Sequence, residues 1–519
     1  MALKDNIYKV RTNAKMSQEQ FAEIFGISRQ AVQKWESGAA TPEMDNLIKI
    51  SKYFDISLDA LLLNNDRRIV EEMKYVKKLQ YQCSVESYSS NLNFEYEQSM
   101  EEGLDIAMYK DVFYAVSRLP MDETKKKLGD VLFEVVLNAK TRHDYEYNEP
   151  SDIDGIRSLL KPYNYDKKHP SDLKDKIYGA WLGRICGCML GKSVEGIRSH
   201  EFIPFLKESG NYPMYRYIYR SDITKDVIEK YEFPFAGRSY ADEIDGMPSD
   251  DDTNYVVLAQ EVIEKYGENF TPLDMINSWV ALQSKNAYCT AEQIAYCNFA
   301  RGYVPPQTAL FENPCREWIG AQIRGDYFGY INPGNPSKAA EMAFRDASVS
   351  HIKNGIYGEM FVSAMIAVAS QTDNIKDIIY AGLAEIPYTS RLYKNILDVI
   401  ECYDDGKDYK ECLKLVSERF DEYTSHGWCH TISNAMIVVM SLLYGEGDFS
   451  KSICMAVESC YDTDCNGATV GSILGMRGGT KCIDSYWTKP FNDKLNTGIF
   501  GMETVKISEK AEMTMKHVK

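Results

Sequence analysis

The spacing of apolar residues predicts helices along almost the whole chain. Apolar positions recur three and four residues apart, and the alternating pattern typical of strands is nearly absent. Ser17 and Ser28 each precede an amphipathic run and are expected to cap the helices that follow them. Three strong breaks interrupt the helical pattern of residues 1–64, at Gly26, Gly38 and Pro42. The pattern therefore predicts an all-α protein.

The character of the sequence changes twice along the chain. Residues 66–169 are charged and rich in tyrosine, with candidate helices around 66–84, 104–117 and 121–141. From Leu173 onward the chain is richer in Gly, Ala and long apolar helices. We expect three parts: a small helical bundle at 1–65, a helical connector and candidate dimerisation segment at 66–170, and a large all-α domain at 171–519.

Composition excludes several classes of protein. Of the 519 residues, 44% are hydrophobic and 26% are charged, as in ordinary globular proteins rather than disordered or fibrous ones. The sequence has no apolar run of about 18 residues and no signal-peptide core behind Met1, so we expect a soluble, cytoplasmic protein without a membrane partner. Thirteen cysteines without a repeating spacing indicate reduced thiols rather than a disulfide scaffold.

The net charge of −17 excludes a protein that coats nucleic acid without sequence preference. This charge is unevenly distributed, because residues 1–64 contain equal numbers of basic and acidic residues and are neutral. The rest of the chain carries the whole excess of acid. A neutral head on an acidic body indicates that the two parts perform different tasks.

The head has the features of two packed helices joined by a tight turn. Ala22 lets the second helix approach the first, Gly26 makes the turn, and Val32 fills the angle between the helices. The second helix then exposes polar side chains that can reach base edges or phosphates. An ordinary helical hairpin with a polar face is the alternative interpretation.

The spacing of Ala22, Gly26 and Val32, together with the helix start at Ser28 and the segment 35–38, closely resembles the XRE-type (Cro-like) helix-turn-helix family. The resemblance covers residues 1–64. It implies that the protein binds double-stranded operator DNA as a homodimer, with the helix that begins at Ser28 in the major groove. It also implies DNA-binding roles for six residues: Gln18, Ser28, Arg29, Gln30, Gln33 and Lys34.

Two acidic clusters stand out in the last part of the chain, Asp250-Asp251-Asp252 and Asp462-Thr463-Asp464. Acids in a first helical turn commonly complement the helix dipole, and that structural role is one interpretation of each cluster. If both clusters point into one cavity, their charges repel unless cations lie among them. Carboxylate and hydroxyl oxygens suit Mg²⁺ or Mn²⁺, and the absence of nearby His or Cys pairs argues against zinc.

A glycine-rich run precedes these clusters. The run from Gly179 to Gly183, followed by Gly187, Gly191 and Glu195, predicts a helix of small residues that ends at a carboxylate. Together with the two acidic clusters, this order strongly resembles the ADP-ribosylglycohydrolase family, from about Leu173 to Phe500. The resemblance implies a compact all-α domain with two Mg²⁺ ions, or Mn²⁺ in their place, in a cleft.

The same resemblance implies roles for individual residues. Glu195 and Asp464 are the candidate catalytic carboxylates, one of which positions the attacking water or assists proton transfer. Gly320, Ala321 and Gln322 fall where the family embraces the diphosphate of the substrate. His351 is a candidate for lining the substrate cleft, with a buried structural histidine as the alternative. The candidate metal ligands are Asp250, Asp251, Asp252, Asp462, Asp464 and Cys465.

Three residues depart from the family pattern. Cys465 replaces a Thr that offers a hydroxyl to the metal, Cys188 stands at the position of a common Asp, and Asp250 replaces a Thr. The core carboxylates are all present. The departures leave a weakly active protein open as an alternative to a full enzyme.

The combined resemblance predicts a DNA-binding, Mg²⁺-dependent ADP-ribosylglycohydrolase. It would hydrolyse the glycosidic bond at C1″ of ADP-ribose attached to a protein or a small acceptor, coupled to sequence-specific DNA binding. A transcriptional regulator whose second domain senses ADP-ribose or another nucleotide sugar, with little turnover, is the alternative. A metabolic hydrolase of ribosyl nucleosides is a third interpretation, because the phosphate-binding loop is weakly marked.

Overall fold

The computed structural model describes residues 3–14, 16–54, 88–168 and 172–518, together with positions 58 and 61. It divides into two compact units, one formed mainly by residues 1–83 and the other by residues 84–300 and 304–519, and each is described by itself. In the described residues the only regular structure besides helices is one two-stranded antiparallel sheet, so the predicted all-α class is confirmed. No described helix is both long and apolar enough to cross a membrane.

The head contains a pair of helices whose first residues follow the predicted caps. The hydroxyl of Ser17 accepts the Gln20 N–H while the Gln20 side chain accepts the Ser17 N–H, and Ser28 accepts the Ala31 N–H at 3.2 Å. Gly26 makes the turn between the two helices with φ of 65°, in the left-handed region that favours glycine. The described helices of the head are α1 (Leu3–Asn13), α2 (Gln18–Phe25), α3 (Arg29–Ser37) and α4 (Met44–Phe54).

The core of the head lies beneath this helix pair. Phe21, Ala22 and Phe25 of α2 are buried in one core with Val32 and Trp35 of α3. Side chains from the flanking helices complete the core: Ile7, Leu47, Ile50 and Leu61. The head therefore has a hydrophobic core of its own.

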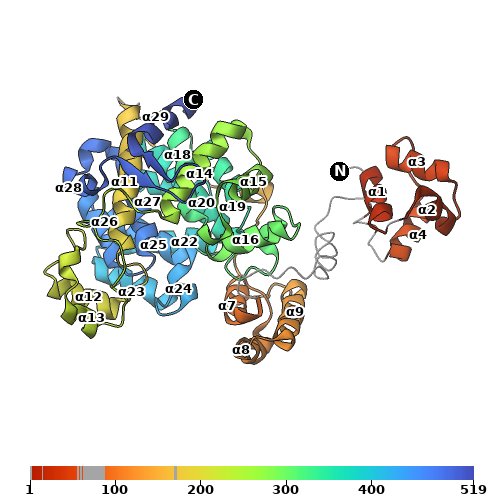
Figure 1. The fold of residues 1–519 in the computed structure, drawn as a ribbon, viewed down its shortest axis with the longest axis horizontal. Helices are drawn as coiled ribbons and strands as arrows, with labels where there is room; N and C mark the ends of the chain where they lie inside the picture. Colours follow the sequence, from red (N-terminus) through yellow and green to blue (C-terminus); the bar gives the residue numbers. More distant parts are fainter. Residues whose placement is uncertain are drawn as a thin grey trace. The chain divides into compact units, whose positions relative to one another are not determined.

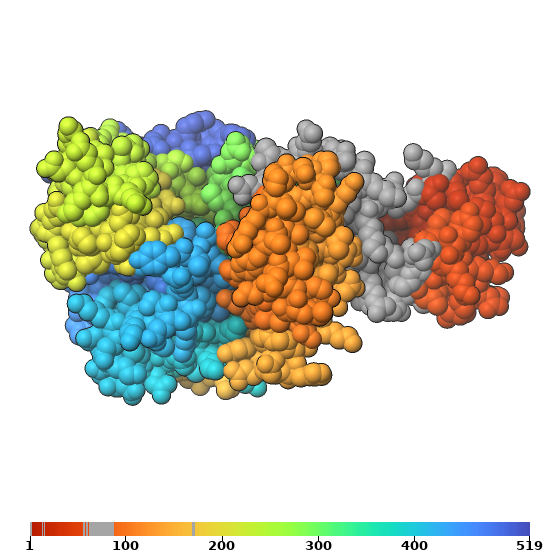
Figure 2. All heavy atoms as spheres, turned by 90° about the horizontal axis from the view of Figure 1, so that it is seen from below, coloured from red at the N-terminus to blue at the C-terminus, as the bar shows by residue number. Residues whose placement is uncertain are grey.

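Residues 88–168, the described part of the predicted connector, pack into the same unit as the C-terminal domain. Arg316 of that domain makes buried ion pairs with Glu95 at 2.8 Å and Glu102 at 2.6 Å. Figure 2 shows the orange surface of this segment lying against the rest of its unit. The candidate helix around 66–84 falls outside the described residues. The elements of 88–168 are η1 (Tyr88–Ser90), α7 (Leu92–Glu101), η2 (Ala107–Tyr109), α8 (Lys110–Ser117), α9 (Glu123–Asn138) and α10 (Ile153–Ser158).

The remaining residues of this unit form a layered assembly of helices (Figure 1). Its first half contains α11 (Leu173–Lys192), α12 (Ser199–Glu208), η3 (Arg220–Asp222), α13 (Lys225–Lys230), α14 (Asp251–Tyr266), η4 (Gly267–Asn269), α15 (Pro272–Leu282), η5 (Lys285–Ala287), α16 (Thr290–Ala300), α17 (Gln307–Leu310), η6 (Gln322–Arg324), α18 (Asp326–Ile331) and α19 (Pro336–Ala347). Its second half contains α20 (Lys353–Ala369), α21 (Ile375–Leu383), α22 (Arg391–Asp404), α23 (Tyr409–Arg419), α24 (Ser425–Cys429), α25 (Thr431–Tyr444), α26 (Phe449–Glu458), α27 (Thr463–Gly478), η7 (Thr480–Cys482), α28 (Ser485–Thr488), η8 (Lys489–Phe491) and α29 (Ile507–His517).

One helix, α20, lies at the centre of the assembly and is buried on every side. Each residue of α20 from Asn354 to Ala369 is buried, and this helix packs on α18, α19, α21, α25 and α27. A helix that is buried all round is expected in the core of a large domain. One small sheet pairs β1 (Lys494–Asn496) with β2 (Thr504–Lys506), and Leu495 of β1 is buried in the same hydrophobic core.

Two glycine-rich helices, α11 and α27, pack with their backbones in direct contact. A Cβ built at Gly187 would overlap the carbonyl of Gly467, and one built at Gly183 would overlap the carbonyl of Gly471. The two helices are antiparallel, because Gly179 meets the end of α27 while Gly191 meets Asp464 at its start. This contact brings the end of α11 to the start of α27, where the second acidic cluster lies (Figure 1).

Candidate active site

The first acidic cluster lies where α14 begins. Asp250 is the N-cap of this helix, since one of its oxygens accepts the Asp252 N–H at 2.9 Å. Its other oxygen lies 2.6 Å from Nζ of Lys192. Asp251 and Asp252 occupy the first turn, where the helix dipole favours negative charge. Both oxygens of Asp250 are therefore already used by the protein.

The second cluster lies where α27 begins. Asp462 is the N-cap residue, but its side chain caps no backbone N–H. The hydroxyl of Thr463 donates to the carbonyl of Gly191 at 3.0 Å, and Asn434 accepts the Asp462 N–H at 3.1 Å. These bonds anchor the start of α27 to the end of α11. Asp464 follows in the first turn and is buried.

The fold brings the two clusters together, as the sequence predicted only conditionally. Ligand atoms of Asp252, Asp464 and Cys465 all lie within 4.8 Å of one another, and the same holds for Cys188, Asp250 and Asp252. Oδ2 of Asp252 and Oδ1 of Asp464 are buried and have no hydrogen-bond partner. A buried carboxylate oxygen without a partner is costly, so these two atoms point to a missing cation or proton.

Arg184 supplies positive charge beneath the acids. Its guanidinium lies 2.8 Å from Oδ1 of Asp252 and 2.8 Å from Asp326, and all three side chains are fully buried. It also donates to the backbone carbonyls of Asp252 and Ile323. Because it is shared between two carboxylates, Arg184 offsets only part of the charge of the acidic clusters.

The acids perturb one another strongly. Burial, reinforced by Asp250 and Asp252, raises the pKa of Asp251 well above its ordinary value. Burial, reinforced by Glu195 and Asp462, does the same to the pKa of Asp464. Neighbouring like charges and burial both disfavour the ionised form. A cation among these carboxylates would restore their charge, so the donor set fits a divalent ion.

Glu195 stands at the solvent side of the cluster. Its side chain is exposed, yet partial withdrawal from water, together with Asp462 and Asp250, raises its pKa to about 7. Asp251 is half-buried and Cys289 is exposed, and both are electrostatically coupled to Glu195. Water and substrate can therefore reach the acids from this side.

The residues expected to bind substrate lie in a neighbouring buried region. Gly320 packs directly against the carboxylate of Glu292, so that a Cβ there would overlap it. His351 is also buried, and its Nδ1 lies 2.8 Å from the Ser350 hydroxyl and 3.9 Å from Glu292. Ala321 and Gln322 are buried as well, and neither amide atom of Gln322 has a partner. The structure thus places Gly320 and His351 beside Glu292.

An arginine lies at the centre of this second region. Arg324 contacts Glu292 at 2.5 Å and Asp346 at 2.8 Å, and burial together with the cation of Arg324 lowers the pKa of His351 well below its ordinary value. Burial raises the pKa of Tyr255 of α14, and the charges of Glu292 and Asp251 both raise it further, so this residue lies between the two regions. His351 is therefore neutral and able to accept or donate one hydrogen bond to a ligand.

A third group with ligand atoms within 4.8 Å of one another joins Glu101 of α7 to His426 and His430. Nε2 of His426 lies 3.2 Å, and Nε2 of His430 3.3 Å, from the Glu101 carboxylate. Their Nδ1 atoms accept hydrogen bonds from the Trp318 indole and the Ile432 N–H, so the proton of each neutral ring is on Nε2. Nε2–H groups that face the Glu101 carboxylate favour hydrogen bonds between α7 and the body over a metal site.

The predicted DNA-binding residues share one face of the head. Ser28, Arg29, Gln30, Gln33 and Lys34 are all exposed at and beyond the start of α3. Within the described part of the head, Arg29 forms an exposed ion pair with Glu19 at 2.8 Å, which a phosphate or base could replace. The spacing of these side chains is that of a helix face that contacts a groove.

Gln18 differs from the other predicted DNA-binding residues. It lies at the first position of α2, is partly buried, and its amide donates to Glu36 at 2.7 Å. Glu36 is in turn paired with Arg11 at 2.5 Å. This network ties α1, α2 and α3 together, and Gln18 would have to leave Glu36 in order to contact DNA.

Sequence reasoning missed several residues of these sites. Arg184 carried a signal, since a charged residue within the apolar run of α11 needs a buried partner. Lys192 lies three residues before Glu195 and was equally readable as a site residue. Glu101 gave no local signal, because its partners His426 and His430 are distant in the sequence.

Comparisons with known proteins match both parts of the chain. The family model described as ADP-ribosylglycohydrolase matches residues 169–511, and the model described as Helix-turn-helix matches residues 7–61. Over 62 residues the chain is 42% identical to the HTH-type transcriptional activator BcrR of Enterococcus faecalis, a match that covers 12% of this chain and 30% of that protein. The chain thus spans less than a third of that relative's length.

Two further matches lie in the larger part. An uncharacterized protein of Archaeoglobus fulgidus is 23% identical over 266 residues, which cover 50% of this chain and 80% of that protein. A solved structure described as an ADP-ribosylglycohydrolase-related protein complex aligns with a TM-score of 0.40 and 15% identity, over 67% of this chain and 98% of that chain.

Proposed function

We propose that this protein is a DNA-binding hydrolase of ADP-ribosyl groups. The chain belongs to the ADP-ribosylglycohydrolase family and has a helix-turn-helix domain at its N-terminus. The bond cleaved is the glycosidic bond at C1″ of ADP-ribose attached to a protein or a small acceptor. The observation that carries the proposal is the meeting of two acidic helix starts, with free buried oxygens on Asp252 and Asp464.

The acids have two tasks in this proposal. Asp251, Asp252, Asp462, Asp464 and Cys465 would hold two divalent cations, Mg²⁺ or Mn²⁺, and Asp250 would lie beside them. Such cations would lower the pKa of a water molecule and help to orient the ribose hydroxyls. The carboxylates also favour the positive charge that develops on the ribosyl carbon as the glycosidic bond breaks. Arg184 holds Asp252 in place from below.

Glu195 and Asp464 are the candidates for moving the proton. Glu195 is the carboxylate that faces solvent, so it can take a proton from the attacking water or deliver one to the leaving group. The cations of Lys192 and Arg238 act on Glu195 and that of Arg198 acts on Asp462, so these three residues are proposed to form a basic rim for the diphosphate of the substrate. Gly320, Ala321, Gln322 and His351 are proposed to line the deeper part of the substrate site.

Release of free ADP-ribose from an ADP-ribosylated model protein tests this assignment. Asp251→Asn and Asp464→Asn should each lower the rate by at least about 10²–10³, since one group that stabilises developing charge is worth that much. Asp245→Asn is the matched control, because Asp245 is exposed and pairs with Lys494 at 2.7 Å on the surface. Full activity in Asp464→Asn, or in excess chelator, would refute the cation-assisted mechanism.

The head is proposed to bind operator DNA through α3. Replacing Arg29, Gln30 and Gln33 by Ala should remove specific binding, because each good base contact is worth about 1–3 kcal/mol. Lys52→Ala, an exposed charge change on α4, should leave the preference for operator over random DNA intact. Unchanged hydrolysis in the triple variant would show that the two activities reside in separate units.

We propose a homodimer as the DNA-binding form. Segment 107–138 exposes large apolar side chains, among them Met108 at 81% and Val131 at 60%. A face of this kind is expected to be covered in a self-association contact, and helix-turn-helix proteins read two half-sites about one DNA turn apart. Sedimentation should give a dimer, and Val131→Asp should weaken it. A stable monomer that binds operator tightly would contradict the proposal.

A ligand sensor is the second candidate function, and the two buried cysteines of the acid cluster favour it. Cys188 and Cys465 replace oxygen donors of the family, which would reduce turnover while leaving ligand binding intact. In that case ADP-ribose should change operator affinity by about 5–150-fold, and operator should change ADP-ribose affinity by the same factor. Titrating operator with and without ADP-ribose decides, since identical curves would remove the sensor function.

A further inference from the structure

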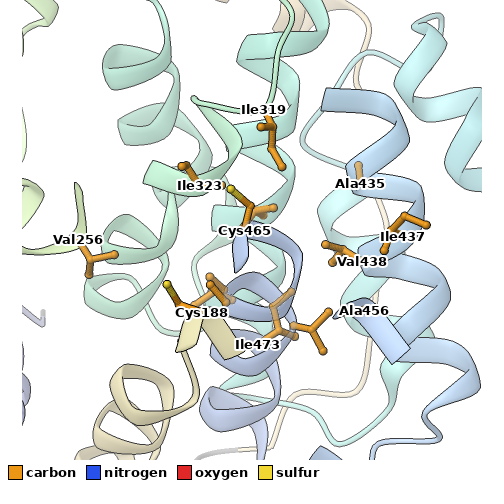
Figure 3. Packing of buried hydrophobic residues seen from close by; sticks show 14 of the residues in the cluster. Cys188, Val256, Ile319, Ile323, Ala435, Ile437, Val438, Ala456, Cys465 and Ile473 are labelled. Atoms are coloured by element: carbon orange, nitrogen blue, oxygen red, sulfur yellow. The ribbon is translucent and has the colours of Figure 1, made fainter. Parts of the chain in front are cut away.

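Two cysteines flank Asp252 in the buried acid cluster. Cys188 comes from α11 and Cys465 from α27, and both are fully enclosed by protein. Figure 3 shows both sulfur atoms directed to the same side of these helices, the side on which Val256 of α14 lies. Asp252 lies one helical turn before Val256 on α14. The sulfur of each cysteine lies within 4.8 Å of a carboxylate oxygen of Asp252.

The two cysteines have unequal partners. Cys188 shares its group with Asp250 and Asp252, but both oxygens of Asp250 are taken, by Lys192 and by a backbone N–H. Cys465 shares its group with Asp252 and Asp464. Oδ2 of Asp252 and Oδ1 of Asp464 are buried and have no hydrogen-bond partner. The two residues are 0% and 3% exposed. The group of Cys465 presents free oxygens on two carboxylates, whereas the group of Cys188 presents one, on Asp252.

This donor set is two carboxylate oxygens and one sulfur. Ligand–ion distances of about 2.0–2.3 Å are normal for carboxylate and thiolate ligands of zinc, and three atoms within 4.8 Å of one another can satisfy them. Mg²⁺ takes oxygen ligands and keeps several waters, so a sulfur in its coordination sphere is unfavourable. Zn²⁺, Fe²⁺ and Co²⁺ accept sulfur and oxygen together.

We infer that one of the two cation positions of this site is built for a thiophilic divalent ion of the zinc type, bound by Asp252 Oδ2, Asp464 Oδ1 and Cys465 Sγ. A fourth position is left for water or substrate, as catalytic zinc sites require. Cys465, not Cys188, is the residue that sets this preference. The inference rests on the proposed function only in taking the acid cluster as a cation site. Its test does not require turnover.

Cobalt provides the direct test, because Co²⁺ bound to sulfur gives a sulfur-to-metal charge-transfer band in the near ultraviolet. Metal-stripped full-length protein is titrated with Co²⁺, and then with Zn²⁺ in competition. We expect the band in the wild type and in Cys482→Ser, the control, which alters a half-buried cysteine just beyond the other end of α27. The band should be absent in Cys465→Thr and Cys465→Ser.

The affinities should change in opposite directions. Cys465→Thr should weaken Zn²⁺ binding by about 100-fold or more. Loss of a residue that only supports a metal ligand already weakens binding by up to about 100-fold, and Cys465 is proposed as a direct ligand. The same variant should bind Mg²⁺ at least as well as the wild type, because its hydroxyl is an oxygen donor. Cys465→Ser changes a single atom, and its circular dichroism checks that the fold is kept. Cys188→Ser should retain the band.

The outcomes separate the two proposals. Co²⁺ binding without the band, or a band that survives in Cys465→Ser, would overturn the inference. If the band is lost in Cys188→Ser but retained in Cys465→Thr, Cys188 is the metal ligand instead of Cys465. That result would also overturn the inference. A cysteine-dependent band in a protein that releases no ADP-ribose would uphold this inference and refute the hydrolase instead.

Discussion

Arg391 is the residue whose loss should most clearly separate segment 88–168 from the body that it covers. Its guanidinium lies 2.9 Å from Glu149 of the segment and 2.7 Å from Glu317 of the body. The arginine side chain is 9% exposed, and the two glutamates are 1% and 0% exposed. Arg391→Met keeps much of the volume and removes the charge, which leaves two carboxylates buried without their cation.

The expected cost follows from what the carboxylates keep. Removing one partner of a buried ion pair costs about 3–5 kcal/mol. Glu149 retains hydrogen bonds from Tyr145 and Asn354, and Glu317 retains hydrogen bonds from Gln98 and from the backbone and side-chain N–H groups of Asn354. Because these neutral donors remain, we expect a value near the lower limit, about 3 kcal/mol. Glu149→Gln added to Arg391→Met should recover part of the loss, since it removes one uncompensated charge.

Arg157→Met is the matched control, because Arg157 also joins the segment to the body, through Glu341 at 2.8 Å. That pair is 51% and 46% exposed, and exposed pairs contribute about 0–1 kcal/mol. Urea unfolding monitored by tryptophan fluorescence gives both free energies of unfolding. Hydrogen exchange should also rise in residues 88–168 of Arg391→Met more than in α20. Equal losses in the two variants would refute a buried anchor.

Two further predictions concern the packing and the pH dependence of the same unit. Gly187→Ala should destabilise the protein by about 1–3 kcal/mol in urea unfolding, because the new Cβ meets the backbone of α27 rather than a movable side chain; an unchanged midpoint would contradict the backbone contact. The second prediction concerns Glu101. Burial opposes its ionisation, but the stronger effect of His426, His430 and Arg391 lowers its pKa to about 2. Glu101 in turn raises the pKa of His426. The stability difference between the wild type and Glu101→Gln should therefore be largest from about pH 4.5 to 6.5, between the unfolded-state pKa values. It should fall as the pH drops towards 2 and as it rises through the folded pKa of His426; a difference that does not vary with pH would contradict the ion pair.

The head could be predicted almost completely from the sequence, because its determinants are local. Ser17 and Ser28 cap helices through atoms three residues away, and Gly26 needs only its own left-handed conformation. The buried residues of α2 and α3 follow directly from the helical spacing. The bonds from Gln18 and Arg11 to Glu36 required the packed structure, since the three residues lie on different helices.

The acid site could be predicted in its members but not in its connections. The sequence places both clusters at helix starts, and the glycines of α11 suggest close packing. It does not show that the partner of those glycines is α27, nor which carboxylate oxygens remain free. Arg184 and Lys192 decide that question, because they occupy Oδ1 of Asp252 and one oxygen of Asp250. Such pairings depend on contacts between helices far apart in the chain.

The charge balance of this site explains why a cation and the fold should depend on each other. Arg184 is divided between Asp252 and Asp326, and Lys192 serves Asp250, so Asp251, Asp462 and Asp464 have no basic partner among the ion pairs of the described residues. The starts of α14 and α27 add about half a positive charge each. The remaining negative charge is met either by protons, which the raised pKa values of Asp251 and Asp464 favour, or by divalent ions. A cation that binds only the folded chain stabilises it by about 2.7 kcal/mol at 100 times its dissociation constant. The same acids that would hold the catalytic ion therefore make the packing of α11 against α27 sensitive to its presence.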